Sequence, residues 1–228
     1  EHIIPEREYS KSTLVSTEIR YRNLIAAFGD RNIEEITTLD IARLIEDLTP
    51  SVSKSLRQVS TDVFNIAISR GLCRDNPAEY TLIKKQVTHR KRLTQSQFKA
   101  IHQNAPVWLQ NAMDLAYITL QRRSDVVTMK FSDIKEGYLY VIQEKTKKHD
   151  TGYLKIKISE SLEQLIKKCQ DPIVSPFIIH RRPERIIKRQ ELEHWTQITP
   201  DYLTRVFQKV RNSLDVFKKM PPEQRPTF

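Results

Sequence analysis

The chain has 228 residues, of which 39% are hydrophobic and 29% are charged, a composition typical of a globular protein with one large domain or two small ones. It contains no apolar run of the ~18 residues that a membrane-spanning helix needs, and its start, EHIIPEREYS, lacks the apolar segment of a secretory signal. Its two cysteines are far apart and match no metal-binding spacing, which favours two reduced thiols in a cytosolic protein.

The net charge of +10 is unevenly distributed along the chain. Residues 1–88 carry 12 Lys and Arg against 13 Asp and Glu, a net charge of −1, while residues 89–228 carry 26 against 15, a net charge of +11. A basic excess of this size favours a polyanionic partner, and nucleic acid is the first candidate.

Apolar residues at helical spacing predict three helices in the first third of the chain. The first covers residues 16–28 and ends before Gly29, and the second, with Thr38 as its N-cap, ends before Pro50. The third ends before Gly71, and its apolar face consists of Leu56, Val59, Val63, Ile66 and Ala67.

A basic connector, KKQVTHRKR, occupies residues 84–92 between two regions of apolar periodicity. Such a stretch fits either a solvated linker or a strap along a phosphate backbone. Lys54 and Arg57, at the start of the third helix, are further candidates for DNA contact, with ordinary helix-surface charge as the alternative. The cations of the connector are Lys84, Lys85, Arg90, Lys91 and Arg92.

The second part of the chain begins with a capping-box pattern, Thr94 with Gln97, which predicts a short helix. A longer helix over residues 106–121 is apolar around most of its surface and should be the buried helix of this part. The apolar period then changes to two in GYLYVIQE and GYLKIKIS, which predicts a β-hairpin.

Three further elements are predicted near the end of the chain. Ser159 is a candidate N-cap for the helix SESLEQLIKKCQ, and PFIIH has the pattern of a short edge strand. Thr199 followed by Pro200 is typical of a helix start. Together, the predicted elements make the fold mainly α-helical, with a small antiparallel β-sheet.

The buried helix leads directly into QRRSDVV, where Arg122 precedes Ser124, a potential N-cap of a short helical segment. A guanidinium beside exposed backbone N–H groups can hold an oxyanion. Asp125, three residues after Arg122, can orient that guanidinium from behind, although an ordinary helix-end ion pair fits the same spacing. Lys145, in the hairpin, fits either a lysine that reaches a neighbouring groove or a solvated turn residue.

The stretch QRRSDVVTMKFSDI, followed by EGYLYVIQEKTKK, resembles the tyrosine recombinases of the lambda-integrase type. In that family an Arg-x-x-Glu/Asp motif follows a buried helix and precedes a hairpin with a catalytic lysine. Arg122 and Asp125 match the motif, and Lys145 matches the lysine. The resemblance covers nearly the whole chain and implies a helical core-binding domain, a basic linker and a partial α+β catalytic domain, in residues 1–83, 84–92 and 93–228.

The chain departs from the family pattern at two places. Leu120 stands where a glycine is frequent, and Arg123 and Ser124 replace a small or apolar pair. The chain also ends at Phe228, where the family continues with a His-x-x-Arg motif and the nucleophilic tyrosine. We therefore expect the chain to be a catalytically incomplete fragment.

The resemblance implies a site-specific DNA recombinase, the integrase of a prophage or mobile element, that acts through a 3′-phosphotyrosine intermediate without metal or other cofactor. Arg122 would bind the scissile phosphate, Lys145 would protonate the 5′-oxygen leaving group, and Asp125 would hold Arg122 in place. DNA contacts are expected from the connector cations and from Lys54, Arg57 and Arg123.

The implied partners are double-stranded DNA attachment sites, other integrase protomers in a tetramer on paired sites, a host DNA-bending protein and an excision factor. No membrane is implied, and the expected location is the cytoplasm of a bacterial cell, at the nucleoid. The alternatives are a non-catalytic DNA-binding module and a type IB topoisomerase-like enzyme. The order of helices before the arginine motif disfavours the topoisomerase.

Overall fold

The computed structural model describes residues 9–85, 87, 91–146, 152–184 and 192–228. The chain divides into two compact units, Glu1–Thr88 and His89–Phe228. The division falls inside the basic connector. In the part of the chain that the structure describes, no helix is long and apolar enough to cross a membrane.

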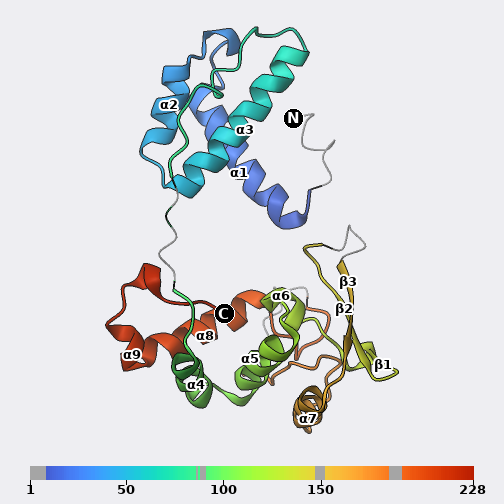
Figure 1. Ribbon diagram of the computed structural model, residues 1–228. Helices are drawn as coiled ribbons and strands as arrows, with labels where there is room; N and C mark the ends of the chain where they lie inside the picture. The colour runs from blue at the N-terminus through green and yellow to red at the C-terminus, as the bar shows by residue number, and fades with distance from the viewer. Residues whose placement is uncertain (1–8, 86, 88–90, 147–151, 185–191) are drawn as a thin grey trace. The chain divides into compact units, whose positions relative to one another are not determined.

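The first unit contains the three helices that were predicted from sequence (Figure 1). They are α1 (Lys11–Phe28), α2 (Thr38–Glu46) and α3 (Pro50–Ser69), with a short 3₁₀ turn, η1 (Ile33–Glu35), before α2. Gly29 follows α1 as predicted, and Gly71, which has a φ of 71°, lies two residues beyond the end of α3.

Thr37, rather than the predicted Thr38, is the N-cap of α2. The Oγ1 atom of Thr37 accepts a hydrogen bond from Asp40 N at 3.2 Å, and Asp40 Oδ2 accepts one from Thr37 N at 2.9 Å. This reciprocal capping box satisfies two backbone donors at once. Thr38 could not form it, because the residue three positions after Thr38 is Ile41, which has no carboxylate. Pro50 does follow α2, but it is also the first residue of α3, where its missing N–H costs no helical hydrogen bond.

The predicted apolar face of α3 forms the centre of this unit. Leu56, Val59 and Ala67 are buried, while Val63 and Ile66 are half-buried. Residues three and four apart lie on one side of a helix, so these apolar residues form one face. α3 packs against both α1 and α2. The segment after α3 is fixed to it by Asn76, whose Nδ2 donates to Thr61 O at 3.0 Å.

The second unit combines helices with one three-stranded antiparallel sheet (Figure 1). The sheet has the order β1-β2-β3, and the predicted hairpin pairs Leu139 with Ile156 and Val141 with Leu154. The strands are β1 (Ile134–Lys135), β2 (Tyr138–Ile142) and β3 (Tyr153–Lys157). The helices and 3₁₀ turns are α4 (Gln95–Asn104), α5 (Val107–Thr119), α6 (Arg123–Val126), η2 (Phe131–Asp133), α7 (Glu160–Cys169), α8 (Pro200–Ser213), α9 (Asp215–Lys218) and η4 (Pro222–Gln224).

The core of the second unit is built around α5, as its sequence predicted. Leu109, Ala112 and Leu115 have no exposed surface, and they pack with residues of the sheet, α7 and α8. The N-caps predicted at Thr94, Ser159 and Thr199 are all present, each accepting a backbone hydrogen bond. The predicted fold class, mainly α with a small antiparallel sheet, is confirmed.

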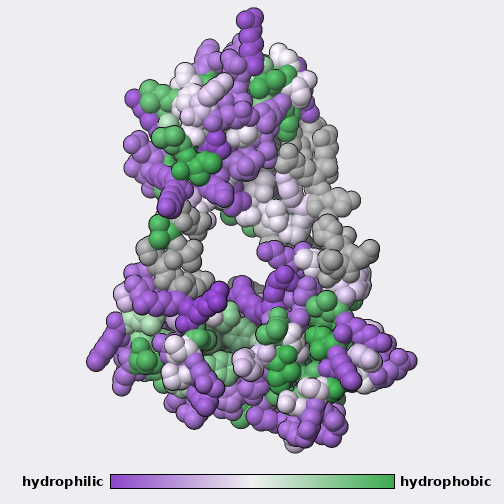
Figure 2. Space-filling model, viewed as in Figure 1, coloured by the Kyte–Doolittle hydropathy of each residue, from purple (hydrophilic) through white to green (hydrophobic). Residues whose placement is uncertain are grey.

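The face of the molecule in Figure 2 is mostly hydrophilic, with small hydrophobic patches between.

Two local predictions for the second unit were wrong. Ser124 lies inside α6, and Arg122 is the N-cap residue, without a side-chain capping bond. The segment PFIIH forms no strand: Phe177 and His180 make only isolated bridges, to Lys130 and Gln197. A short apolar run has no intrinsic preference that separates a strand from a buried irregular segment.

The pH dependence of the first unit should depend on Asp40. The guanidinium of Arg31, together with hydrogen bonds from Thr37, holds the pKa of Asp40 well below its usual value of 3.8. The stabilisation is therefore complete above the unfolded pKa of 3.8 and is lost as the pH falls below it towards the folded pKa. Urea titrations of the intact chain, followed through NMR signals of α2, should show this loss between pH ~5 and ~2.

Asp40→Asn should remove most of that pH dependence and lower the stability of α2 at neutral pH. Asp30→Asn is the control, since Asp30 is an exposed carboxylate in the turn after α1. An unchanged acid profile in Asp40→Asn would contradict the assignment.

Candidate functional site

Arg122 is presented by a tight reversal of the chain at the end of α5. Leu120 adopts the left-handed conformation, with φ 56° and ψ 27°, and its N–H donates to Ala116 O. The carbonyl of Arg122 then accepts hydrogen bonds from Asp125 N and Val126 N, both at 2.9 Å. The backbone of Arg122 is fixed on both sides, while its side chain is 47% exposed.

Asp125 lies behind the guanidinium of Arg122 and is completely buried. Its Oδ2 atom is 3.9 Å from Arg122 Nη1. Its Oδ1 atom accepts hydrogen bonds from Ser124 Oγ and Glu144 N, both at 3.3 Å. Among the described residues, Asp125 Oδ2 has no hydrogen-bond partner, and its ion-pair partner is the guanidinium of Arg122.

The turn that carries Lys145 lies against the loop that carries Arg122. β2 continues into Gln143, whose N–H donates to Gly152 O at 2.8 Å, and Thr146 N donates to Gln143 O at 3.0 Å. The residue before Lys145, Glu144, donates its backbone N–H to the Asp125 carboxylate. The structure thus places Arg122 beside Asp125, and it bonds the residue before Lys145 to the same carboxylate. Their chemical roles are taken up below as a proposal.

Two of the residues predicted to bind DNA have hydrogen-bond partners within the first unit. The ammonium of Lys84 donates hydrogen bonds to two backbone carbonyls at and just after the end of α2. These are the carbonyls of Glu46 and of Leu48, the latter at 3.2 Å. Arg57 donates to the carbonyls of Thr81 at 3.2 Å and Glu79 at 2.9 Å. These two cations therefore hold the fold of the first unit together, and their role as DNA contacts stays a prediction.

The remaining residues predicted to contact DNA differ in their exposure and in their bonds to the protein. Arg123 is hydrogen bonded to Thr204 Oγ1 and lies 3.8 Å from Asp201, both in the first turns of α8. Arg90 lies outside the residues that the structure describes. The others are exposed, namely Lys54, Lys85, Lys91 and Arg92.

Sequence reasoning missed two groups that connect the predicted catalytic residues. The backbone N–H of Glu144 has no sequence signal, because any residue supplies one. Gln143 does have a weak signal: it is the polar residue at which the alternating pattern of β2 stops, and its side chain is hydrogen bonded to Gln121, next to Arg122.

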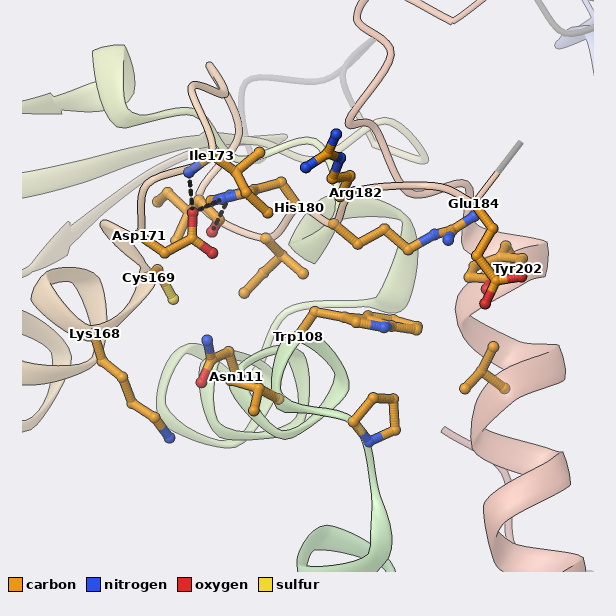
Figure 3. A pocket seen from close by; sticks show the side chains of 16 residues that line it. Trp108, Asn111, Lys168, Cys169, Asp171, Ile173, His180, Arg182, Glu184 and Tyr202 are labelled. Carbon is orange, nitrogen blue, oxygen red and sulfur yellow. Dashed lines mark hydrogen bonds and ion pairs between the residues drawn. The ribbon is translucent and has the colours of Figure 1, made fainter. Parts of the chain in front are cut away.

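A second candidate site is a cavity of about 470 Å³ between α5, α7, α8 and residues 171–184 (Figure 3). His180 is buried in its wall, with Nδ1 2.8 Å from a backbone carbonyl and Nε2 3.1 Å from Asp171 Oδ1. Both ring nitrogens thus lie within hydrogen-bond distance of groups of the protein itself. Burial raises the pKa of the Cys169 thiol to about 11, which keeps it protonated at neutral pH.

None of the residues predicted as catalytic lines this cavity. Among the described residues, no group of three His, Cys, Asp or Glu side chains could hold a metal ion. The Arg122 loop and the hairpin turn therefore form the stronger candidate site.

Comparison with known proteins identifies the family. The sequence model of the phage integrase family matches residues 66–201, more than half of the chain. The chain belongs to the phage integrase family. The matched region includes the loop of Arg122 and the hairpin of Lys145.

Integrases of two Escherichia phages illustrate the relationship. The integrase of phage HK022 is 29% identical over 97% of this chain, and that of phage lambda is 35% identical over 64% of it. The matches cover 62% and 43% of those two integrases, so the chain spans about half the length of its curated relatives.

Solved structures of lambda integrase have the same fold. A dimer of its residues 75–356 bound to a COC′ core site superposes with a TM-score of 0.81 at 26% identity, over 99% of this chain and 81% of that one. A lambda integrase tetramer bound to a Holliday junction gives a TM-score of 0.81 at 27% identity, over 99% of this chain and 66% of that one.

The left-handed backbone of Leu120 predicts that Leu120→Gly stabilises this integrase-family chain. A side chain at this φ is strained, and Leu120 is 84% exposed, so little packing is lost with it. We expect a gain of about 1 kcal/mol in the free energy of unfolding, measured by urea titration.

Leu120→Ala is the matched control, since it removes the exposed apolar side chain but keeps the strain. It should give no gain. Equal stabilities of the two variants would show that the left-handed conformation is not what limits stability here.

Proposed function

We propose that the full protein is a site-specific DNA recombinase, an integrase of a prophage or mobile element, and that this chain supplies part of its DNA-cleavage site. One observation carries the proposal: a single buried carboxylate, Asp125, contacts the guanidinium of Arg122 and the backbone of Glu144, beside Lys145. In the proposal, the guanidinium of Arg122 and the ammonium of Lys145 act on the same phosphate. Membership of the phage integrase family supports it.

The chemistry of phosphodiester transfer explains why two cations are needed. A tyrosine Oη–phosphorus bond forms as the phosphorus–O5′ bond breaks, and the tyrosine proton passes to solvent. The non-bridging oxygens of the phosphate gain charge, which a guanidinium neutralises through two parallel hydrogen bonds. The leaving O5′ takes the bond's electron pair and accepts a proton, which Lys145 donates. No metal or other cofactor is required for these steps.

In this scheme Arg122 binds the scissile phosphate through the donors that face solvent. Asp125 fixes the guanidinium from behind, so that little side-chain entropy is lost when the phosphate binds. A 5′-hydroxyl of a partner duplex then attacks the phosphotyrosine and reverses the step. The partners are therefore double-stranded attachment sites and, as with lambda integrase on a Holliday junction, further protomers in a tetramer.

The charge distribution supports DNA as the partner. The second unit carries a net charge of +11 and the first a net charge of −1, and a strong positive field attracts a duplex from a distance. We place the protein at the nucleoid of a bacterial cell, where its DNA substrates are.

Arg122→Ala should abolish covalent complex formation by the full-length gene product while leaving DNA binding nearly intact. Loss of one donor to a transition-state oxyanion costs on the order of 2–4 kcal/mol, a rate loss of roughly 30- to 10³-fold. The assay traps the protein–DNA complex on a duplex attachment site and resolves it by denaturing electrophoresis.

Arg123→Ala is the control for a nearby charge, since Arg123 is bonded to α8 instead. It should retain most of the covalent product. Normal trapping by the Arg122 variant would contradict the proposal, and binding without trapping by the unaltered protein would favour a non-catalytic DNA-binding module.

DNA binding by this chain should depend steeply on salt. If about six phosphates are contacted, the affinity for duplex DNA should fall about 10³-fold between ~50 and ~200 mM salt, because bound counterions are released. The measurement is a fluorescence anisotropy titration at several salt concentrations. An affinity that does not change with salt would contradict backbone contacts of this number.

A further inference from the structure

Three hydrogen bonds run head to tail from the lysine turn to the arginine loop. Thr146 Oγ1 donates to Gln143 Oε1 at 3.1 Å, and Gln143 Nε2 donates to Gln121 Oε1 at 2.6 Å. Gln121 Nε2 then donates to Thr119 O, the last carbonyl of α5, at 3.0 Å. We call the side chains of Gln121, Gln143 and Thr146 the glutamine relay.

The direction of the relay is fixed at one end by the backbone. A carbonyl can only accept, so the amide of Gln121 must turn its nitrogen to Thr119 O and its oxygen to Gln143. That oxygen in turn requires the nitrogen of Gln143, which leaves Gln143 Oε1 for the hydroxyl of Thr146. Flipping either amide would bring two acceptors together. The relay is half-buried, where unpaired polar groups are costly.

The relay includes Thr146, the residue directly after Lys145. Gln143 and Thr146 are joined twice, by the relay bond and by the backbone bond from Thr146 N to Gln143 O at 3.0 Å. Lys145 lies between them, after Glu144, whose backbone N–H is bonded to Asp125. Both attachments to the arginine loop, Gln143 to Gln121 and Glu144 to Asp125, come directly before the lysine, and Thr146 ties the chain after the lysine back to Gln143. Two attachments fix the orientation of a turn, whereas one would leave it able to swing.

We propose that Gln143 is a positioning residue, which holds the backbone of Lys145 in register with Arg122 so that the ammonium reaches the leaving oxygen. The inference rests on the proposed function. A general acid has to approach within hydrogen-bond distance of the atom that it protonates. Lysine has a long flexible side chain, so the position of its backbone decides how often that distance is reached.

Three substitutions separate the relay from the bulk of the hairpin. Gln143→Met keeps the length of the side chain but breaks both relay bonds. Thr146→Val keeps the shape of the side chain and removes only the hydroxyl, while Thr146→Ser restores that hydroxyl. Gln164→Met is the matched control, because Gln164 is an exposed glutamine on α7.

The substrate provides a readout that a general loss of structure would not give. Full-length protein is mixed with duplexes in which the scissile bond has either the natural 5′-oxygen or a bridging 5′-sulfur, and single-turnover formation of the covalent complex is measured. Sulfur leaves readily as a thiolate and needs no proton, so a defect in proton donation is largely relieved on the sulfur substrate. A defect in phosphate binding persists on both substrates.

Gln143→Met and Thr146→Val should slow cleavage of the oxygen substrate roughly tenfold, as expected for a misplaced catalytic group. On the sulfur substrate both should recover to within about threefold of the unaltered protein, and Lys145→Ala should recover in the same way. Thr146→Ser and Gln164→Met should be nearly normal on both substrates. Arg122→Ala should remain slow on both substrates.

Equal slowing of the relay variants on the two substrates, or no slowing at all, would overturn the positioning role while leaving the proposed function in place. Thr146→Val decides the matter if Gln143→Met fails to fold, since its substitution is isosteric. If the unaltered protein forms no covalent complex with either substrate, the proposed function and the inference both fail.

Discussion

The candidate site depends on one fully buried carboxylate. Asp125 has no exposed surface, and an ionised carboxylate in such a place requires a cation and hydrogen-bond donors. The cation is Arg122, at 3.9 Å, and one donor is the backbone of Glu144, at 3.3 Å. Because one buried group contacts both, separating the arginine loop from the hairpin would remove a hydrogen bond to a buried carboxyl group. Under the proposed function, these two segments form one site.

The parts of the fold that could be predicted from sequence are those decided by local signals. Thr94, Ser159 and Thr199 were identified as N-caps because a capping side chain bonds only to its own next turn. The prediction of Thr38 as an N-cap was wrong because Thr37, the residue before it, has the carboxylate of Asp40 three residues on and forms a capping box with it. The segment PFIIH was misassigned because only its tertiary neighbours decide whether an apolar run becomes a strand.

The candidate site was less accessible to sequence reasoning than the fold. Arg122, Asp125 and Lys145 stood out in the sequence, but their catalytic roles came from resemblance to a family, because spacing alone favours an ordinary ion pair and a solvated lysine. What joins them is a backbone N–H and the amide of Gln143, whose partners are 19 and 22 residues away in the chain. Such contacts follow from how the hairpin packs on α5 and α6, and no local pattern specifies that packing.

The internal bonds of several cations show why a basic sequence is an incomplete guide to a DNA-binding surface. Lys84 and Arg57 donate to main-chain carbonyls, which satisfies acceptors at the end of α2 and in the segment after α3. A cation used in this way still contributes to the electric field but offers fewer free donors to a phosphate. The first unit, with a net charge of −1, then has little long-range attraction for a polyanion, whereas the second unit has a net charge of +11. Under the proposed function, the second unit attracts the duplex, and the first contributes contacts at short range, through its shape and the cations that remain free.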